Sequence, residues 1–354
     1  MNKINVLIVD DSAFMRKLIS DFLKEDSRIE IVGTARNGLD ALSKIKKLRP
    51  DVITMDVEMP EMNGIEALKR IMDEQPLPVV MLSSTTKEGA ENTFAAMQHG
   101  AVDFIQKPSG SISMDLHIIK EEIVNKVLNA SKANLKSLQK PINTQKTPTT
   151  KVLDYSKIEP SIRNSEKKLL CIGTSTGGPR ALQQVLTRIP KDYNAPILIV
   201  QHMPPGFTKS LANRLDSLCD INVKEAENGE FLTAGTAYIA PGGFHLKVKR
   251  IGTSLAIHID DSEIRNGHRP SVDVMFESVS NIKDVRKIAV IMTGMGADGS
   301  KGLKKLKETG QVFSIAESKE TSIVFGMPKA AIETNLVDRV VPLDEIAETV
   351  LSLT

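Results

Sequence analysis

Three polar residues in the second half of the chain each follow a run of apolar residues that is typical of a buried strand. Ser175 follows KLLCIGT, His202 follows PILIVQ, and Asp298 follows KIAVIM and a glycine-rich turn. If these strands are parallel, their carboxyl ends meet at one edge of a sheet and the three side chains lie together. Such a set has the chemistry of a Ser-His-Asp triad, in which the imidazole takes the serine proton and the carboxylate orients the imidazole.

The turn around Ser175 reads GTSTGG at residues 173–178, and its letters alone fit more than one chemistry. It matches G-x-S-x-G, the pattern of a nucleophilic serine on a sharp turn, but three glycines after a strand also suit an anion-binding loop or a plain turn. The stretch lacks the glycine spacing of G-x-G-x-x-G and an obvious ribose-binding acid, which disfavours dinucleotide binding. The order serine, histidine, aspartate also differs from the α/β-hydrolase order, which disfavours that fold.

Other residues compete for the roles of base and acid. His268, in NGHRPSVD before a predicted helix, is a rival base or a substrate contact. The acids that compete with Asp298 are Asp260, Asp261 and Asp273. Only Asp298 follows a strong buried-strand pattern at a glycine-rich turn. Ser175 considered alone could instead be the N-cap of a helix.

Glycines surround Asp298 in TGMGADG, and glycine lets backbone amides approach a ligand closely. A tetrahedral intermediate of acyl transfer needs such amides as hydrogen-bond donors to its oxyanion. We expect the amide of Met295 to be one donor and the amide of Thr176, directly after the serine, to be the other.

A second group of chemistry-bearing residues follows the strand patterns of the first half. Asp10 and Asp11 end the first strand, Asp56 the third and Ser83 the fourth, and Lys107 follows the fifth. Three carboxylates at one sheet edge repel one another unless a cation lies among them, and oxygen ligands suit Mg²⁺. Asp56 is then the natural acceptor of a phosphoryl group, with the Lys107 charge and the Ser83 hydroxyl stabilising its oxygens. Any one of these aspartates alone could merely cap a helix.

Two sheets are needed to position these residues. Five short strands, each followed by a helix, predict a doubly wound parallel (βα)5 domain at residues 1–133. A stretch rich in Pro, Thr, Asn, Gln and Lys predicts a linker at 134–167. Strands and helices alternate again at 168–354, which predicts a second α/β domain with a mainly parallel sheet. Consecutive strands near 222–260 indicate a small antiparallel flap in that domain.

Length, charge and cysteine content narrow the class of protein. A chain of 354 residues favours two domains, and a formal charge of +2 does not indicate a large nucleic-acid footprint. No stretch approaches the roughly 18 apolar residues of a membrane span. Cys171 and Cys219 have no C-x-x-C spacing, which argues against a zinc site and a disulfide framework. We therefore expect a cytoplasmic protein that neither binds nucleic acid nor is embedded in a membrane.

The first-half motifs VDDSAFMR, DVEMPEMNG, VVMLSS and DFIQKP resemble the receiver domain of two-component response regulators over about residues 1–125. The resemblance implies that Asp56 is the phospho-acceptor. It also implies that Mg²⁺ is held by Asp11, Asp56 and the backbone carbonyl of Glu58, with Asp10 supporting the site. Phe104 would occupy the aromatic switch position, although a lone Phe is equally well explained as a core residue.

The motifs GTSTGG, IVQHMPPGFT, YIAPGGFH, GHRPSVD and MTGMGADG together resemble the catalytic domain of the CheB family of chemotaxis methylesterases. This resemblance implies hydrolysis of glutamate 5-O-methyl esters on methyl-accepting chemoreceptors, with release of methanol and no cofactor for the ester reaction. It also implies deamidation of receptor glutamines, and phosphorylation by a chemotaxis histidine kinase. The domain order suggests that the unphosphorylated receiver covers the active-site edge. The alternative is a response regulator whose output domain binds a partner or nucleic acid and catalyses nothing.

Overall fold

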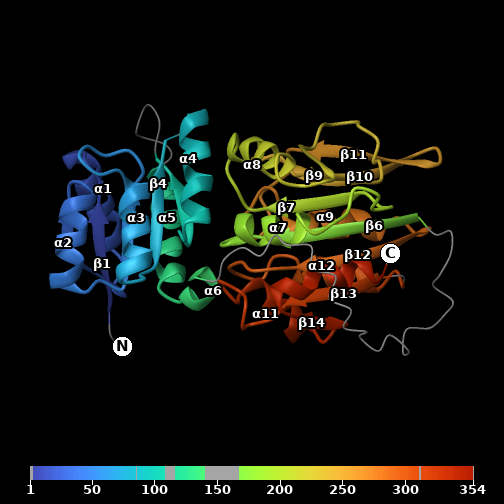
Figure 1. The fold of residues 1–354 in the computed structure, drawn as a ribbon. Coiled ribbons are helices and arrows are strands. Elements are labelled where there is room, and N and C mark those ends of the chain that lie inside the picture. The colour runs from blue at the N-terminus through green and yellow to red at the C-terminus, as the bar shows by residue number, and fades with distance from the viewer. Residues whose placement is uncertain (1–2, 85, 108–115, 140–166, 311, 354) are drawn as a thin grey trace.

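The computed structural model describes residues 3–84, 86–107, 116–139, 167–310 and 312–353, and the chain forms two α/β domains that lie next to each other (Figure 1). The N-terminal domain contains a five-stranded sheet and the C-terminal domain a seven-stranded sheet with a separate two-stranded sheet. The predicted fold class is therefore confirmed.

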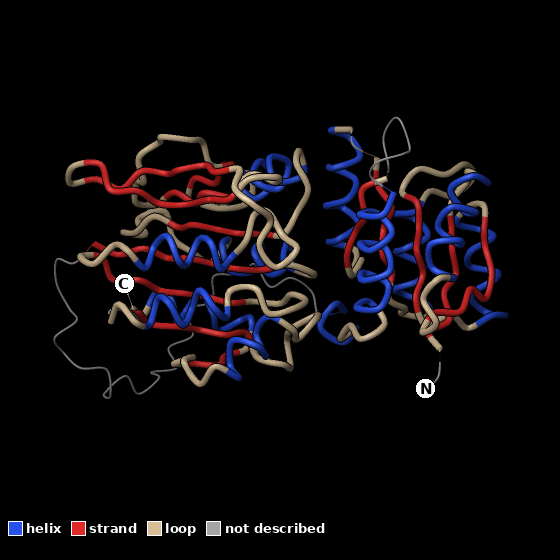
Figure 2. The backbone as a smooth tube through the Cα atoms, turned by 180° about the vertical axis from the view of Figure 1, so that it is seen from behind, coloured by secondary structure: helices blue, strands red, loops and turns tan. Residues whose placement is uncertain are grey.

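The N-terminal sheet is parallel throughout and has the order β2-β1-β3-β4-β5. Its strands are β1 (Ile4–Val9), β2 (Ile29–Ala35), β3 (Val52–Asp56), β4 (Val79–Ser83) and β5 (Asp103–Gln106). Its helices are α1 (Ala13–Lys24), α2 (Gly38–Leu48), α3 (Gly64–Glu74), α4 (Lys87–Gln98) and α5 (Leu116–Ala130). Helices α1 and α5 cover one face and α2, α3 and α4 the other, as the view from behind also shows (Figure 2). Both faces of every inner strand are therefore buried, which accounts for its continuous apolar pattern.

The C-terminal sheet is also parallel, with the order β14-β13-β12-β6-β7-β9-β8. Its strands are β6 (Lys167–Thr174), β7 (Ile197–Gln201), β8 (Asn222–Glu225), β9 (Thr236–Ile239), β12 (Val285–Ile291), β13 (Val312–Glu317) and β14 (Arg339–Val341). On one face lie α7 (Gly178–Leu186), α8 (Phe207–Asp216) and α12 (Leu343–Leu351). On the other lie α9 (Val272–Ser280), α10 (Ser300–Lys307), α11 (Met327–Glu333) and the hairpin of β10 (His245–Ile251) and β11 (Ser254–Asp260).

The antiparallel flap is smaller than the sequence predicted. Only β10 and β11 form it, whereas β8 and β9 join the edge of the parallel sheet. Segment 226–235 connects β8 to β9 without a helix, because its backbone pairs with β11. Gly229 donates to the Ile257 carbonyl at 2.9 Å, and Leu232 donates to the Leu255 carbonyl at 2.9 Å. The sequence patterns did not predict β8, α11, β14 or α12.

The predicted linker begins with a short helix, α6 (Leu135–Gln139). The Asn134 amide group and the Ser137 hydroxyl both donate to the carbonyl of Glu320 at 3.1 Å, and Leu138 is buried. The first residues after α5 are therefore docked on the C-terminal domain. The rest of the predicted linker, residues 140–166, lies outside the described residues, and the domain boundaries stay a prediction.

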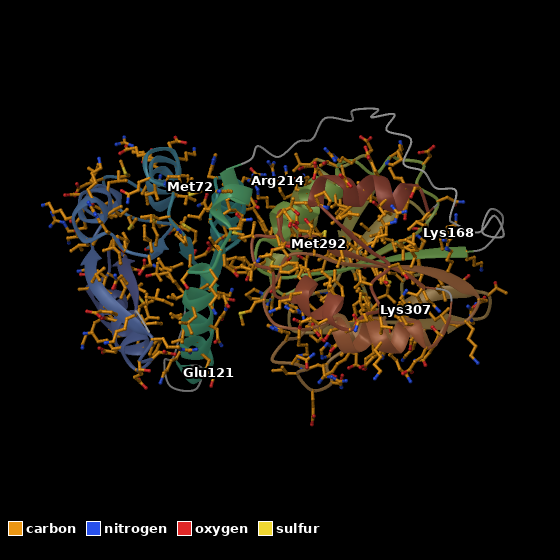
Figure 3. All side chains as sticks on the ribbon, turned by 90° about the horizontal axis from the view of Figure 1, so that it is seen from below. Met72, Glu121, Lys168, Arg214, Met292 and Lys307 are labelled. Atoms are coloured by element: carbon orange, nitrogen blue, oxygen red, sulfur yellow. The ribbon has the colours of Figure 1, made fainter. Side chains whose placement is uncertain are left out.

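The N-terminal domain packs against the end of the C-terminal domain where the strands of that domain finish. Lys168, at the start of β6, lies far from the N-terminal domain, whereas Met292, just after β12, lies on the side toward it (Figure 3). Helix α4 contacts α7 and α8, and the rings of Phe104 and Phe207 stack with their centroids 4.7 Å apart. The carboxyl edge of the C-terminal sheet is therefore the edge that meets the N-terminal domain.

Candidate active site

Strand register places Ser175 and His202 next to each other. Thr174 at the end of β6 pairs with Gln201 at the end of β7, and each candidate residue is the next one along its strand. The His202 amide donates to the Thr174 carbonyl at 3.2 Å, and the Gln201 side chain donates to the Ser175 carbonyl at 3.0 Å. The two residues are thus held together by backbone geometry at the carboxyl edge of the sheet.

Asp298 reaches this point from the turn after β12. Its Oδ2 lies 2.8 Å from Nε2 of His202, and both side chains are almost completely buried. Four further donors hold the carboxylate: the Asn266 side chain, the Ser271 hydroxyl, and the amides of Val272 and Asp273 at the start of α9. The three sequence-predicted triad residues therefore converge.

The environment of Asp298 favours its charged form. Burial raises the pKa of this carboxyl, but the His202 hydrogen bond and charge, the Val272 amide and the Ser271 hydroxyl lower it more strongly, to below its ordinary value. The helix amides add positive partial charge at the same place. A carboxylate that is ionised near neutral pH is the partner that an imidazolium ion requires.

The two ring nitrogens of His202 differ in their environment. Nε2 faces Asp298, while Nδ1 is buried and has no hydrogen-bond partner within the described residues. Within the described residues, the Ser175 hydroxyl makes no hydrogen bond to His202. Asp298 thus contacts Nε2, the reverse of the arrangement in which the aspartate holds Nδ1.

The rival base, His268, lies against the ring of His202. The two imidazoles stack with centroids 3.8 Å apart and planes inclined by 11°. Burial lowers the pKa of His268 to about 3, and the neighbouring His202 charge lowers it as well. A base with so low a pKa is a poor proton acceptor near neutral pH. The geometry therefore favours His202 as the base.

The rival acids occupy other positions. Asp273 accepts from the amides of Gly299 and Gly302 at 2.9 and 2.6 Å, and so holds the start of α10. Asp260 pairs with Lys247 at 2.7 Å in the β10–β11 hairpin, and Asp261 is exposed. Among these acids only Asp298 bonds to the imidazole of His202.

The amides of Met295 and Thr176 have no acceptor among the described residues. Their loops are held close together, because the Ser175 amide donates to the Thr293 carbonyl at 3.0 Å. A Cβ added at Gly294 would lie 2.9 Å from the Cβ of Ser175. Two free backbone donors beside a serine are what an oxyanion site requires.

The N-terminal domain gathers its acids as predicted. Asp10, Asp11 and Asp56 each offer a carboxylate oxygen within 4.8 Å of the others. Lys107 reaches two of them, with Nζ 2.6 Å from Asp56 and 3.0 Å from Asp10. Burial raises the pKa of Asp56 to about 6 although Lys107 lowers it. A single lysine does not offset three clustered acids, so the donor set fits a bound Mg²⁺ ion.

The other predicted receiver residues are not all turned toward Asp56. The Ser83 hydroxyl donates to the Gly89 carbonyl at 2.9 Å and accepts from Thr93 at 2.7 Å, so it faces α4. The amide of Glu58 lies 3.4 Å from an oxygen of Asp56, which places Glu58 beside the acid cluster. Phe104 is buried against Phe207 of the C-terminal domain.

Sequence reasoning missed two contacts between the domains at the candidate oxyanion site. The Thr176 hydroxyl donates to the carboxylate of Asp103, and the Asn129 side chain contacts the sulfur of Met295. Asp103 begins β5 and Asn129 lies in α5, so both come from the N-terminal domain. Local sequence patterns give no signal for such contacts, because they depend on how the two domains dock.

A receiver fold joined to an α/β domain with this serine, histidine and aspartate defines a response regulator whose output domain is a hydrolase. Comparison with known proteins gives the same result, since the family model for CheB methylesterase matches residues 170–350 and that for the response regulator receiver domain matches residues 6–118. The chain belongs to the CheB methylesterase family.

Individual relatives are similar over the full length. A protein-glutamate methylesterase/protein-glutamine glutaminase of Geobacillus kaustophilus is 60% identical, covering 100% of this chain and 99% of the relative. A protein of the same name from Halalkalibacterium halodurans is 57% identical over 99% of this chain and 98% of its own. The crystal structure of the Thermotoga maritima CheB methylesterase catalytic domain is 48% identical with a TM-score of 0.52, covering 54% of this chain and all of that one. No described helix is long and apolar enough to cross a membrane.

Proposed function

We propose that this protein hydrolyses glutamate 5-O-methyl esters on methyl-accepting chemoreceptors, releases methanol, and deamidates receptor glutamines. The observation that carries the proposal is the buried hydrogen bond of 2.8 Å between His202 and Asp298 beside the turn that bears Ser175. The names of the full-length relatives support the same substrates. Receptor helices on the cytoplasmic side would place the enzyme in the cytoplasm.

The reaction follows from the roles of the three side chains. Ser175 Oγ attacks the ester carbonyl while His202 Nδ1 takes its proton, and Asp298 stabilises the imidazolium through Nε2. The proton then passes to the departing methoxide, and methanol leaves an acyl-enzyme on Ser175. Water, activated by the same imidazole, hydrolyses the acyl-enzyme to the glutamate carboxylate. A primary amide passes through the same steps with ammonia as the leaving group.

The oxyanion of each tetrahedral intermediate lies, in this proposal, between the amides of Met295 and Thr176. Support comes from the lack of any acceptor for these two donors within the described residues. Preorganised amides stabilise the oxyanion more than the ground-state carbonyl, and removal of one donor in measured oxyanion holes costs about 3 kcal/mol of activation free energy.

Phosphorylation of Asp56 is proposed to switch this reaction on. An oxygen of Asp56 attacks the phosphorus of a phosphohistidine on the kinase, and the bond from phosphorus to the histidine nitrogen breaks. Asp11, Asp56 and the Glu58 carbonyl would hold Mg²⁺, with Asp10 supporting; this ion neutralises the phosphoryl oxygens when bound. Lys107 supplies a fixed charge, and Ser83 exchanges its bond to α4 for one to the phosphoryl group.

Occlusion by the N-terminal domain explains why the unphosphorylated form would be slow. Asp103 and Asn129 contact the side chains of Thr176 and Met295, the two residues whose amides are the proposed oxyanion donors. Phe104, in the proposed switch position, stacks on Phe207 in the same interface. A change at Asp56 that moves Phe104 would therefore loosen the cover over the active site.

The test measures release of labelled methanol from methylated receptor membranes, with and without a small-molecule phosphodonor. We expect hydrolysis by the full chain to rise with the phosphodonor, and Ser175→Ala to abolish it in both conditions. Asp56→Asn should retain only the basal rate. Full activity of Ser175→Ala would refute the triad. Absence of hydrolysis by the intact, phosphorylated chain would favour an output domain that only binds a partner.

A further inference from the structure

A buried carboxylate that the proposed mechanism does not use lies at the same sheet edge. Glu317 is the last residue of β13 and has no exposed surface. Its Oε2 accepts a hydrogen bond of 2.7 Å from the backbone amide of Thr293. Within the described residues Glu317 makes no ion pair and Oε1 has no hydrogen-bond partner, although the side chain of Thr321 lies close enough to lower the pKa of the carboxyl. Burial of a carboxyl group with so few partners costs folding free energy.

Thr293 connects Glu317 to the loop of the nucleophile. The Thr293 carbonyl accepts from the Ser175 amide at 3.0 Å and from the Thr174 hydroxyl at 2.8 Å. The Thr293 hydroxyl donates to the Thr176 carbonyl at 2.9 Å. Three successive residues, including the proposed nucleophile and one proposed oxyanion donor, are therefore bonded to a single threonine.

The same hydroxyl also holds the other side of the site. It accepts from the Val324 amide at 3.0 Å, and Gly294, the next residue after Thr293, donates to the Val324 carbonyl at 3.0 Å. The Gly294 carbonyl accepts from Gly326 and Met327. Thr293, in the loop that precedes Met295, thus joins the Ser175 loop to the segment around Val324 that precedes α11. Glu317 is the group that holds the Thr293 amide.

We propose that Glu317 is a positioning residue for the esterase reaction, which acts through Thr293 on the backbone of residues 174–176. The expected effect on kcat rests on the proposed function, whereas the expected effect on the backbone of residues 174–176 does not. The carboxylate touches neither Ser175 nor His202, so its removal changes the placement of the nucleophile and of the Thr176 amide. Placement governs the chemical step more than the binding of a receptor helix, so the effect is on kcat.

The test compares two substitutions of similar size. Glu317→Gln keeps an oxygen acceptor for the Thr293 amide, whereas Glu317→Leu removes it and leaves that amide unpaired in a buried place. With the phosphorylated full chain we expect kcat within about threefold of the native value for Glu317→Gln and at least about tenfold lower for Glu317→Leu, with KM within twofold in both. Ser314→Ala is the matched control, since Ser314 is a buried hydrogen-bonding residue of β13 that bonds to Asp338 and not to Thr293.

A second measurement does not depend on catalysis. Amide hydrogen exchange of peptide 173–178 should be faster in Glu317→Leu, because the Ser175 amide loses its fixed acceptor, and unchanged in Glu317→Gln and Ser314→Ala. Unchanged exchange in Glu317→Leu overturns the inference whatever the activity, as does equal loss of kcat in the Gln and Leu variants. If Glu317→Leu does not fold, Glu317→Asp, which retracts the acceptor by one methylene, takes its place with a smaller loss of kcat. Full hydrolysis by Ser175→Ala would instead refute the proposed function and leave the exchange result valid.

Discussion

The hydroxyl of Thr176, the residue after the proposed nucleophile, donates a hydrogen bond to the carboxylate of Asp103 in the other domain. Both side chains are buried, so this bond lies inside the domain interface and not at its rim. A buried hydrogen bond to a charged group contributes more than an exposed one. The contact therefore couples the docking of the receiver domain to the loop where the oxyanion would form.

Removal of this contact should activate the unphosphorylated enzyme. We expect Asp103→Ala to raise the rate of methanol release without a phosphodonor by about tenfold, because a charged hydrogen bond that holds the cover in place is lost. Asp103 also pairs with Lys126 at 3.2 Å, and Glu122 pairs with the same lysine at 3.0 Å but makes no hydrogen bond to the described residues of the C-terminal domain. Glu122→Ala is therefore the control and should leave the basal rate unchanged. An unchanged basal rate in Asp103→Ala would argue against occlusion through Thr176.

Asp298 should be far more important for the reaction than its neighbour Asp273. We expect Asp298→Asn to lower kcat by about 10⁴-fold, since an amide neither fixes the tautomer of His202 nor stabilises its charged form. Asp273→Asn keeps an oxygen for the amides of Gly299 and Gly302, so its loss of kcat should be at least tenfold smaller. Steady-state kinetics of the phosphorylated chain measure kcat for both variants. Equal losses of kcat would reject Asp298 as the unique acid.

Phosphorylation should require both the acid cluster and a divalent cation. We expect transfer of a phosphoryl group from a small-molecule donor to be abolished by a chelator and restored by added Mg²⁺, because the clustered carboxylates repel an anionic donor without the ion. Asp11→Asn should raise the Mg²⁺ concentration that phosphoryl transfer needs, because a proposed ligand of the ion is lost. Asp56→Asn should remove the phosphorylated species seen by intact-protein mass spectrometry. Phosphorylation of Asp56→Asn at full yield would identify another acceptor.

Glu317 should make folding stability depend on pH. Burial raises its pKa from 4.5 to about 7, so the folded state binds the proton more tightly than the unfolded state. The stabilisation from this group is complete below about pH 4.5 and is lost as the pH rises through about 7. We expect the free energy of unfolding of the native chain, relative to Glu317→Gln, to fall by about 3 kcal/mol from pH 4 to pH 8.

Denaturant unfolding of both proteins across this range measures the difference directly. Arg180 and Asp344 line the same cavity as Glu317, and neither residue is changed in the Gln variant. A difference that does not vary with pH would show that Glu317 has an ordinary pKa in the folded chain.

Much of the site could be predicted from the sequence, because strand ends are visible in local patterns. Runs such as KLLCIGT or PILIVQ are typical of strands that bury both faces inside a parallel sheet, and ligand-binding residues of such sheets gather at the carboxyl edge. Ser175, His202 and Asp298 converge for this reason, and so do Asp10, Asp11, Asp56 and Lys107. The glycines around Met295 likewise indicated free backbone amides.

Other features depend on contacts between segments far apart in the chain. Asp298 contacts Nε2 of His202 because of how the turn after β12 lies against α9. His268 stacks on His202 because of how the segment that follows β11 is docked. The parallel addition of β8 and β9 depends on pairing of segment 226–235 with β11. Periodicity within one element carries no information about these contacts.

The sequence by itself determined which residues end the buried strands, and hence which chemistry each domain can perform. Only the tertiary structure decided how the receiver domain contacts the esterase site. The contacts join Asp103 to Thr176, Asn129 to Met295 and Phe104 to Phe207. The physical reason is the range of the interactions. Strand burial is a property of a few consecutive side chains, whereas a docked interface depends on the complementary shape and charge of two surfaces that form only after each domain has folded.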